Sequence, residues 1–225
     1  MRTRVGIVST KEMNEYVSNL LADAIKGDEV KVLTRTDDSV NVVDLLSNEK
    51  IEELRKKNPP LIFVEIVKKI LERAISESRK NNFFKSQEYS KRLRKILEKY
   101  NDRDNTFAPE STIVDLVNFA GEMVKDENEA NKLGIFGRER AFYDALIRDK
   151  SAKELLNDET LKLIAHELKD VVEEYALTDW PNKESTRARM RTNIKECLKK
   201  YHYPPEYRKQ AVDDVIKQAE YIMVE

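Results

Sequence analysis

Apolar residues recur at spacings of three and four through most of the chain, and this pattern constrains the fold more than any other feature. It is strongest after Pro59-Pro60, where the apolar positions cover more than half of a helix circumference. These positions are Leu61, Ile62, Phe63, Val64, Ile66, Val67, Ile70, Leu71, Ala74 and Ile75. A helix that is apolar so far round must be packed by neighbours on several sides. The sequence therefore predicts an all-α protein, a multi-helix bundle in which this helix is central.

The composition agrees with a helical fold. Charged residues make up 37% of the 225 positions and apolar residues 40%, with only five glycines and six prolines. Glu, Lys, Leu, Ala and Arg lose little rotamer freedom in a helix. Two short strands near the N-terminus, Arg4 to Ser9 and Asp28 to Thr36, remain a possible addition to the helical fold. No period of 20–50 residues repeats, which argues against a solenoid.

The best internal boundary is the polar connector from Asn101 to Pro109. It divides the chain into residues 1–104, with a basic helix, and residues 105–225, with an arginine-rich helix; together we expect them to form one compact domain of a larger parent. Glu49–Asp104 holds 16 basic and 10 acidic residues, and Asn105–Ala176 holds 9 and 16, although the whole chain carries a net charge of only −1. Two regions of opposite charge either steer a charged partner or neutralise each other within one fold.

The stretch from Thr178 to Arg191 holds the only tryptophan and the densest arginine spacing. Pro181 fits only the first turn of a helix or the residue before it, where Asp179 or Asn182 would cap the free amides. We expect Trp180 to fold over that turn as a packing anchor. The predicted buried face of this helix consists of Met190, Ile194, Cys197, Leu198 and Tyr201.

A basic ridge climbs the same helix at steps of four: Arg187, Arg191, Lys195 and Lys199. It starts beside the apolar stripe and winds away into solvent. Two interpretations remain open. The ridge is either a solvated face whose long stems cover the edge of the core, or a contact surface for an anionic partner. Arg187, Arg191 and Lys195 are therefore the candidate contacts to a partner or to DNA.

Little in the sequence indicates chemistry, and we predict no catalytic, cofactor-binding or metal-binding residues. The pair Glu29 and Lys31, with Asp23 upstream, resembles the acidic-plus-lysine grouping of nucleases but is short enough to arise by chance. His166 lies opposite the apolar stripe of its helix, and His202 lies in a connector. No phosphate-binding loop with its lysine and hydroxyl occurs.

Cellular location can also be predicted from the sequence. The single cysteine, Cys197, excludes an internal disulfide and a thiolate metal cage, and a cysteine on an apolar face behaves as a small hydrophobe. No segment approaches 18 uninterrupted apolar residues, and the N-terminus lacks a signal-peptide pattern. We therefore expect a cytoplasmic protein with no membrane partner.

Three stretches in order resemble a known family. They are Asn58-Pro59-Pro60 with the apolar helix, Arg79-Lys80-Asn81 and Tyr100-Asn101; Phe142-Tyr143-Asp144-Ala145-Leu146 followed by Ser151-Ala152-Lys153-Glu154-Leu155-Leu156; and Ala176-Leu177-Thr178-Asp179-Trp180 through Arg187-Ala188-Arg189-Met190-Arg191 to Tyr201-His202-Tyr203-Pro204-Pro205. From about residue 40 onward the chain is similar to the C-terminal domain of type I restriction enzyme R subunits. The resemblance implies a helical domain that docks the R subunit, with its nuclease and ATP-driven translocase, onto the modification and specificity subunits. No nuclease or ATPase motif of that family has a matching position here, so the resemblance implies no catalysis and no cofactor.

Two rival functions remain beside docking. One is an autonomous helical nucleic-acid-binding module that uses Glu49–Asp104 and the basic ridge. Its affinity would fall steeply with salt, whereas protein docking would depend on salt less. The other is a small hydrolase that uses Glu29 and Lys31, which a metal-dependent nuclease assay would reveal.

Overall fold

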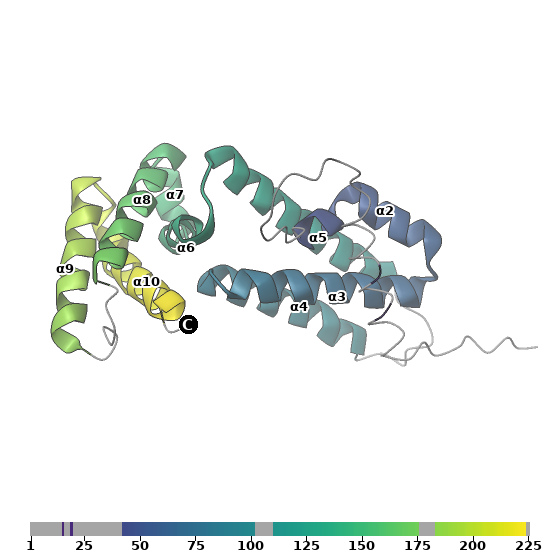
Figure 1. The fold of residues 1–225 in the computed structure, drawn as a ribbon. Coiled ribbons are helices and arrows are strands. Elements are labelled where there is room, and N and C mark those ends of the chain that lie inside the picture. The colour runs from purple at the N-terminus through teal and green to yellow at the C-terminus, as the bar shows by residue number, and fades with distance from the viewer. Residues whose placement is uncertain (1–14, 16–18, 20–41, 102–109, 176–182, 224–225) are drawn as a thin grey trace, which may run out of the picture. The chain divides into compact units, whose positions relative to one another are not determined.

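The computed structural model describes residues 15, 19, 42–101, 110–175 and 183–223, and these ranges are almost wholly helical (Figure 1). In chain order the elements are the 3-10 helix η1 (Val42–Leu46), α2 (Asn48–Lys57), α3 (Pro60–Arg79), α4 (Phe83–Asn101), α5 (Glu110–Leu133), α6 (Gly137–Leu146), α7 (Lys150–Leu155), α8 (Asp158–Tyr175), α9 (Glu184–Lys200) and α10 (Pro205–Met223). No strand occurs among the described residues, and the all-α prediction is confirmed. The strand pair considered near the N-terminus lies outside them.

The contacts between Cα atoms divide the chain into two compact units. Unit 1 consists of Met1–Ala74 and Arg92–Lys125, and unit 2 of Ile75–Lys91 and Asp126–Glu225. The long helices α3, α4 and α5 therefore contribute residues to both units. The division at residue 104 stays a prediction, because most of the connector on which it rests, residues 102–109, lies outside the described part of the chain.

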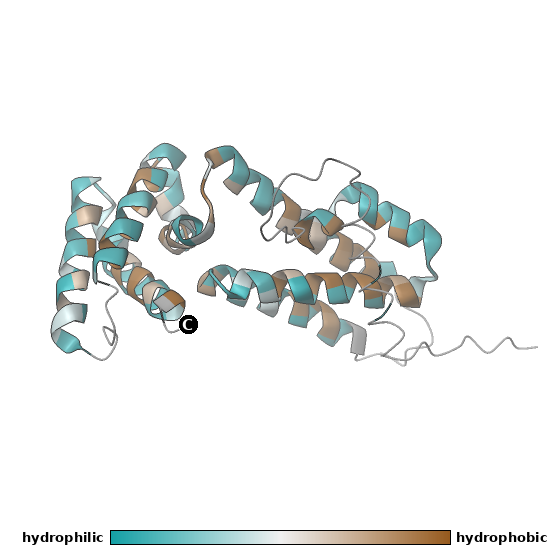
Figure 2. Ribbon diagram, viewed as in Figure 1, coloured by the Kyte–Doolittle hydropathy of each residue, from teal (hydrophilic) through white to brown (hydrophobic). Residues whose placement is uncertain are grey.

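Unit 1 contains most of α3, the helix whose sequence is the most apolar, and its central position stays a prediction. This helix begins at Pro60, where a missing N–H has no helical partner to lose. Its side chains buried in this unit are Phe63, Val64, Ile66, Val67, Ile70, Leu71 and Ala74. The buried side chains of α5, among them Leu116, Phe119 and Met123, belong to the same unit. Hydrophobic residues recur along each of these helices (Figure 2).

Unit 2 has a core of four packed helices. Helix α6 packs against α8 and α10, and α9 packs against the same two helices. The predicted face of α9 is confirmed for Met190, Ile194, Cys197 and Leu198, which are all buried, while Tyr201 at its end is only half-buried. Tyr203, in what the sequence indicates only as a connector, is also buried, and its hydroxyl donates a hydrogen bond to the Leu146 carbonyl at 2.9 Å. This bond fixes the α9–α10 connection to the end of α6.

Two helix boundaries bear on the sites described below. The chain breaks its helix at Asn81-Asn82: α3 ends at Arg79, α4 begins at Phe83, and Asn82 Oδ1 accepts a hydrogen bond from the Lys85 amide at 3.0 Å. Helix α9 begins at Glu184 with Lys183 in the N-cap position. Trp180, Pro181 and the two predicted caps, Asp179 and Asn182, lie outside the described residues.

Candidate functional site

The basic ridge of α9 faces the carboxylates of α10. Arg187 Nη2 lies 2.5 Å from Glu220 Oε1, and Arg191 Nη1 forms an ion pair with Asp213 Oδ1. Lys195 is exposed and has no ion pair with any described residue. Of the three candidate contacts on the ridge, two therefore join α9 to α10, and Lys195 has no ion pair among the described residues.

These two ion pairs are only partly buried. The side chains of Arg187 and Arg191 remain 41% and 47% exposed. Pairs of this kind contribute little to stability, because water already solvates both charges well. The positions of Arg187 and Arg191 agree with the interpretation that their aliphatic side-chain stems cover the edge of the core. The role of Arg187, Arg191 and Lys195 as partner contacts stays a prediction.

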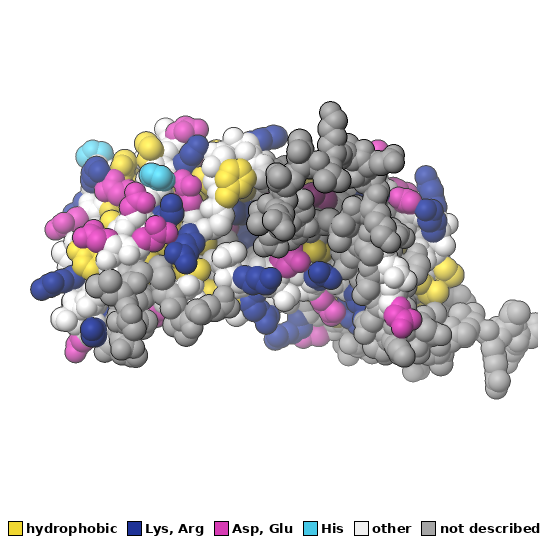
Figure 3. All heavy atoms as spheres, viewed as in Figure 1, with side chains coloured by type: hydrophobic (Ala, Val, Ile, Leu, Met, Phe, Trp, Pro, Cys, Tyr) yellow, Lys and Arg dark blue, Asp and Glu magenta, His cyan; other side chains and the backbone are white. Residues whose placement is uncertain are grey.

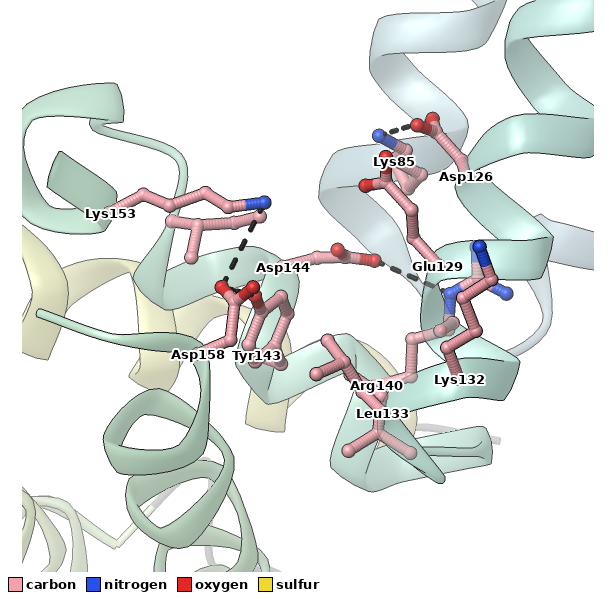
Figure 4. A pocket seen from close by; sticks show the side chains of 13 residues that line it. Lys85, Asp126, Glu129, Lys132, Leu133, Arg140, Tyr143, Asp144, Lys153 and Asp158 are labelled. Atoms are coloured by element: carbon pink, nitrogen blue, oxygen red, sulfur yellow. Dashed lines mark hydrogen bonds and ion pairs between the residues drawn. The ribbon is translucent and has the colours of Figure 1, made fainter.

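Unit 2 contains a second charge-rich region, a pocket of about 340 Å³ that we call the charged pocket. It lies among the start of α4, the end of α5, α6 and the α7–α8 region (Figure 4). Its charged lining residues are Lys85, Asp126, Glu129, Lys132, Arg140, Asp144, Lys153 and Asp158. Four cations thus face four carboxylates.

The charged pocket is held by pairs between different helices. Lys85 Nζ on α4 lies 2.7 Å from Asp126 Oδ2 on α5. Arg140 on α6 forms an ion pair with Glu127 on α5 and lies 3.8 Å from Asp144 on its own helix. Asn82, before α4, donates a hydrogen bond to Asp144 Oδ2 at 2.6 Å. Figure 4 shows Asp144 pointing from α6 toward Arg140, with the Lys85–Asp126 pair nearby.

Burial sets the protonation properties of this network. The Asp144 side chain is only 13% exposed, and burial raises the pKa of its carboxyl above the ordinary value, against the opposing effects of Lys85, Arg140 and Asn82. Burial alone would lower the pKa of Lys85, but the hydrogen bond to Asp126 and the charge of Asp144 raise it above its ordinary value. Burial and the hydrogen bond to Asp158 raise the pKa of Tyr143. In the charged pocket, ion pairs and hydrogen bonds therefore offset the cost of burying charged groups.

The side chains most often used for catalysis or metal binding do not form a site in the described part of the chain. No group of three or more His, Cys, Asp or Glu side chains in the described ranges is placed to hold a metal ion. His166 is exposed, as predicted, 3.5 Å from Glu139. Cys197 is buried, which raises the pKa of its thiol to about 12. Asp23, Glu29 and Lys31 lie outside the described residues.

Sequence reasoning missed the charged pocket, although one signal for it exists. Asp144 interrupts an otherwise apolar and aromatic run on α6, from Ala141 to Leu146. A carboxylate inside a buried run must find a cation or a hydrogen-bond donor. That rule predicts a partner for Asp144, but it does not predict that Asn82 and Arg140 supply it.

The described residues thus define an all-α domain in which ion pairs join neighbouring helices. The family described as type I restriction enzyme HindI endonuclease subunit-like, C-terminal, matches residues 3–225. The chain belongs to this family. Among the described residues no helix is long and apolar enough to cross a bilayer.

Two curated relatives are similar to the chain. One is the type I restriction enzyme HindI endonuclease subunit of Haemophilus influenzae, 32% identical over 184 residues, which are 80% of this chain and 17% of that protein. The other is the putative type I restriction enzyme MjaIXP endonuclease subunit of Methanocaldococcus jannaschii, 26% identical over 85% of this chain and 18% of that protein. The chain therefore spans less than a fifth of the length of these relatives. No solved structure matches it.

Proposed function

We propose that the chain is the subunit-docking domain of a type I restriction R subunit. In this role it supports assembly of the ATP-dependent, DNA-translocating endonuclease on the core of modification and specificity subunits, and it has no catalysis of its own. The observation that carries the proposal is the family match over residues 3–225, because that family is the C-terminal part of endonuclease subunits. We place this assembly in the cytoplasm.

The distribution of charge supports docking to protein. On the face seen in Figure 3, acidic and basic side chains of the described residues are interspersed. Two of the three candidate contacts, Arg187 and Arg191, have carboxylate partners on α10. A surface for the phosphate backbone needs uncompensated cations, whereas protein interfaces combine charges of both signs.

A nucleic-acid-binding module remains the second candidate, and α4 carries the observation in its favour. Arg94 and Lys95 are exposed and have no ion pair with other described residues. Their neighbours Arg92 and Lys99 are paired with Glu122 and Asp115 on α5. Even with Lys91 of the same helix, these are few cations for a phosphate surface, so we rank this function below docking.

Binding measurements at several salt concentrations separate the two functions. We expect the chain to bind the purified modification–specificity core with an affinity that falls only shallowly between about 50 and about 200 mM salt. Duplex DNA without the core should bind weakly. If the chain fails to bind the core but binds DNA tightly, with an affinity whose logarithm falls steeply with the logarithm of the salt concentration, the nucleic-acid module replaces docking as the function.

The proposed lack of catalysis has its own test. We expect no ATP hydrolysis and no DNA cleavage by the chain, with or without magnesium. The matched variant is Glu29→Gln with Lys31→Met. Turnover that the wild type shows and this variant loses would establish the hydrolase and contradict the proposal.

A further inference from the structure

A second hollow in unit 2, which we call the cationic groove, has a volume of about 790 Å³. Its lining includes Phe83, Phe84, Lys91, Arg148, Lys153 and Lys217. In total five cations and three carboxylates line it, so its charge is unbalanced, unlike that of the charged pocket.

The two phenylalanines form an aromatic floor with cations over it. Their rings meet edge to face, with centroids 5.1 Å apart and an interplanar angle of 83°. The Arg148 guanidinium lies 4.6 Å from the centroid of Phe84, and Lys217 Nζ lies 4.6 Å from that of Phe83. These distances are typical of cation–π contacts, which orient long basic side chains at modest energy.

Buried hydrogen bonds hold this floor in place. Gln218 on α10 is fully buried, and its Oε1 accepts a hydrogen bond from the Phe83 amide at 3.0 Å. Its Nε2 donates to the Asn81 carbonyl at 2.9 Å. The start of α4 is therefore tied to α10 directly beneath the aromatic pair, and the floor is ordered before any partner binds.

The cations of the groove differ in how fully they are engaged. Arg148 Nη1 lies 2.5 Å from the nearly buried carboxylate of Asp214, which fixes the guanidinium while leaving its side chain 50% exposed. Lys91 and Lys217 are exposed, and neither has an ion pair with a described residue. Their charge is available to a carboxylate from outside.

We infer that the cationic groove binds an acidic segment of a protein partner. This inference rests on the proposed docking function and names the surface and the chemistry of its partner. Carboxylates of the segment face Lys91 and Lys217, and an apolar side chain of the segment rests against the half-buried Phe83 and Phe84. A fixed aromatic floor reduces the entropy lost on binding, and the excess positive charge selects an acidic sequence.

Single-stranded nucleic acid fits the same groove less well. Bases bind such sites by stacking on open aromatic faces. Here Lys217 and Arg148 lie over the faces of the two rings, and the carboxylates of Glu88 and Glu154 also line the groove. A continuous row of phosphates would meet those carboxylates, whereas a peptide can place its few charges opposite the lysines.

The test uses the whole chain and three probes: a short peptide of Glu, Asp and Leu, its copy with Lys in place of the acidic residues, and single-stranded oligothymidylate. The test variant is Lys91→Glu with Lys217→Glu, which leaves the Arg148–Asp214 pair intact. We expect it to weaken binding of the acidic peptide at least about tenfold. The matched control, Arg189→Glu with Lys209→Glu, makes the same change of charge at exposed positions of unit 2 that do not line the groove. It should change the affinity less than about twofold.

Thermal unfolding curves verify that both variants fold, and peptide-induced shifts of the Phe83 and Phe84 ring resonances locate the bound peptide. An acidic peptide that fails to bind, binds equally to test and control variants, or binds no better than oligothymidylate overturns the inference. Binding of the modification–specificity core is measured in parallel. If the wild type and the groove variant bind the core equally well, the inference about the groove is wrong, and the docking function stands. If the wild type does not bind the core, the proposed docking function itself has failed.

Discussion

The charged pocket and the cationic groove lie in the same unit and share Lys85 and Asp144, yet they treat charge in opposite ways. At the pocket, Lys85 pairs with Asp126, and Arg140 pairs with Glu127 and Asp144; these five side chains are only 13–31% exposed. In the groove, cations outnumber carboxylates, and two of them, Arg148 and Lys217, lie over aromatic rings. Removal from water makes an unpaired charge costly, so buried charges must be matched within the fold, while exposed ones remain available to a partner. The effect of a substitution on stability should then fall as exposure rises.

The largest loss of stability should follow Arg140→Met. This substitution removes the cation that pairs with Glu127 and lies 3.8 Å from Asp144, side chains that are only 24% and 13% exposed. Breaking such a pair costs about 3–5 kcal/mol, most of it the penalty of the uncompensated charge. Urea unfolding at neutral pH measures the change.

The control for this substitution is Arg138→Met on the same helix. Arg138 pairs with Glu173 at 3.3 Å, with both side chains more than 40% exposed. Its loss should cost less than about 1 kcal/mol. Equal losses for Arg140 and Arg138 would show that burial does not separate the two kinds of pair.

The next largest effect should come from Lys85→Met, and it should depend on pH. Removing the cation leaves the Tyr89 hydroxyl as the one remaining donor to Asp126 among the described residues, at a cost of about 1–3 kcal/mol. The folded-state pKa of Lys85 is raised above its ordinary value of 10.5. The stability that this lysine contributes is therefore fully present below about pH 10.5 and is lost as the pH rises through the folded-state value.

The measurement is the difference in unfolding free energy between wild type and Lys85→Met from neutral to strongly alkaline pH. We expect this difference to stay constant up to about pH 10 and to shrink above it. A difference that grows with alkalinity would mean that the Lys85–Asp126 pair is not what stabilises this site.

Sequence patterns predicted the fold well because they record which face of each helix is buried. The buried faces of α9 and α3 follow from spacing alone. The charged pocket does not follow in this way. Asn82 and Asp144 are 62 positions apart, so their contact depends on how α4 and α6 pack.

The same limit explains the basic ridge. The spacing of Arg187 and Arg191 places them correctly beside the apolar stripe of α9, but no pattern within one helix reveals that Asp213 and Glu220 of α10 lie opposite. Carboxylates occur throughout a chain with 42 acidic residues, and packing selects which of them form pairs.

A smaller effect is expected for Arg187→Gln with Arg191→Gln. Both pairs with α10 are intermediate in exposure, and each is worth up to about 1 kcal/mol. The double variant should lose less than about 2 kcal/mol, and the loss should shrink in high salt because exposed charges are screened. A loss above 3 kcal/mol that salt leaves unchanged would place these pairs with the buried network.

The smallest change in stability is expected for Lys195→Glu, which is the cleanest test of the ridge as a contact surface. Lys195 is exposed without an ion pair among the described residues, so its reversal should leave the unfolding free energy within about 0.5 kcal/mol of wild type. Because α10 already neutralises Arg187 and Arg191, Lys195 is the one of the three candidate contacts left without an ion pair among the described residues. One exposed pair is worth about 0.2–1 kcal/mol, so we expect at most about a fivefold loss of affinity for the modification–specificity core. That is smaller than the loss expected for Lys91→Glu with Lys217→Glu in the groove. A folded Lys195→Glu variant that binds the core more than about tenfold more weakly would make the ridge the main docking surface and reduce the groove to a secondary one.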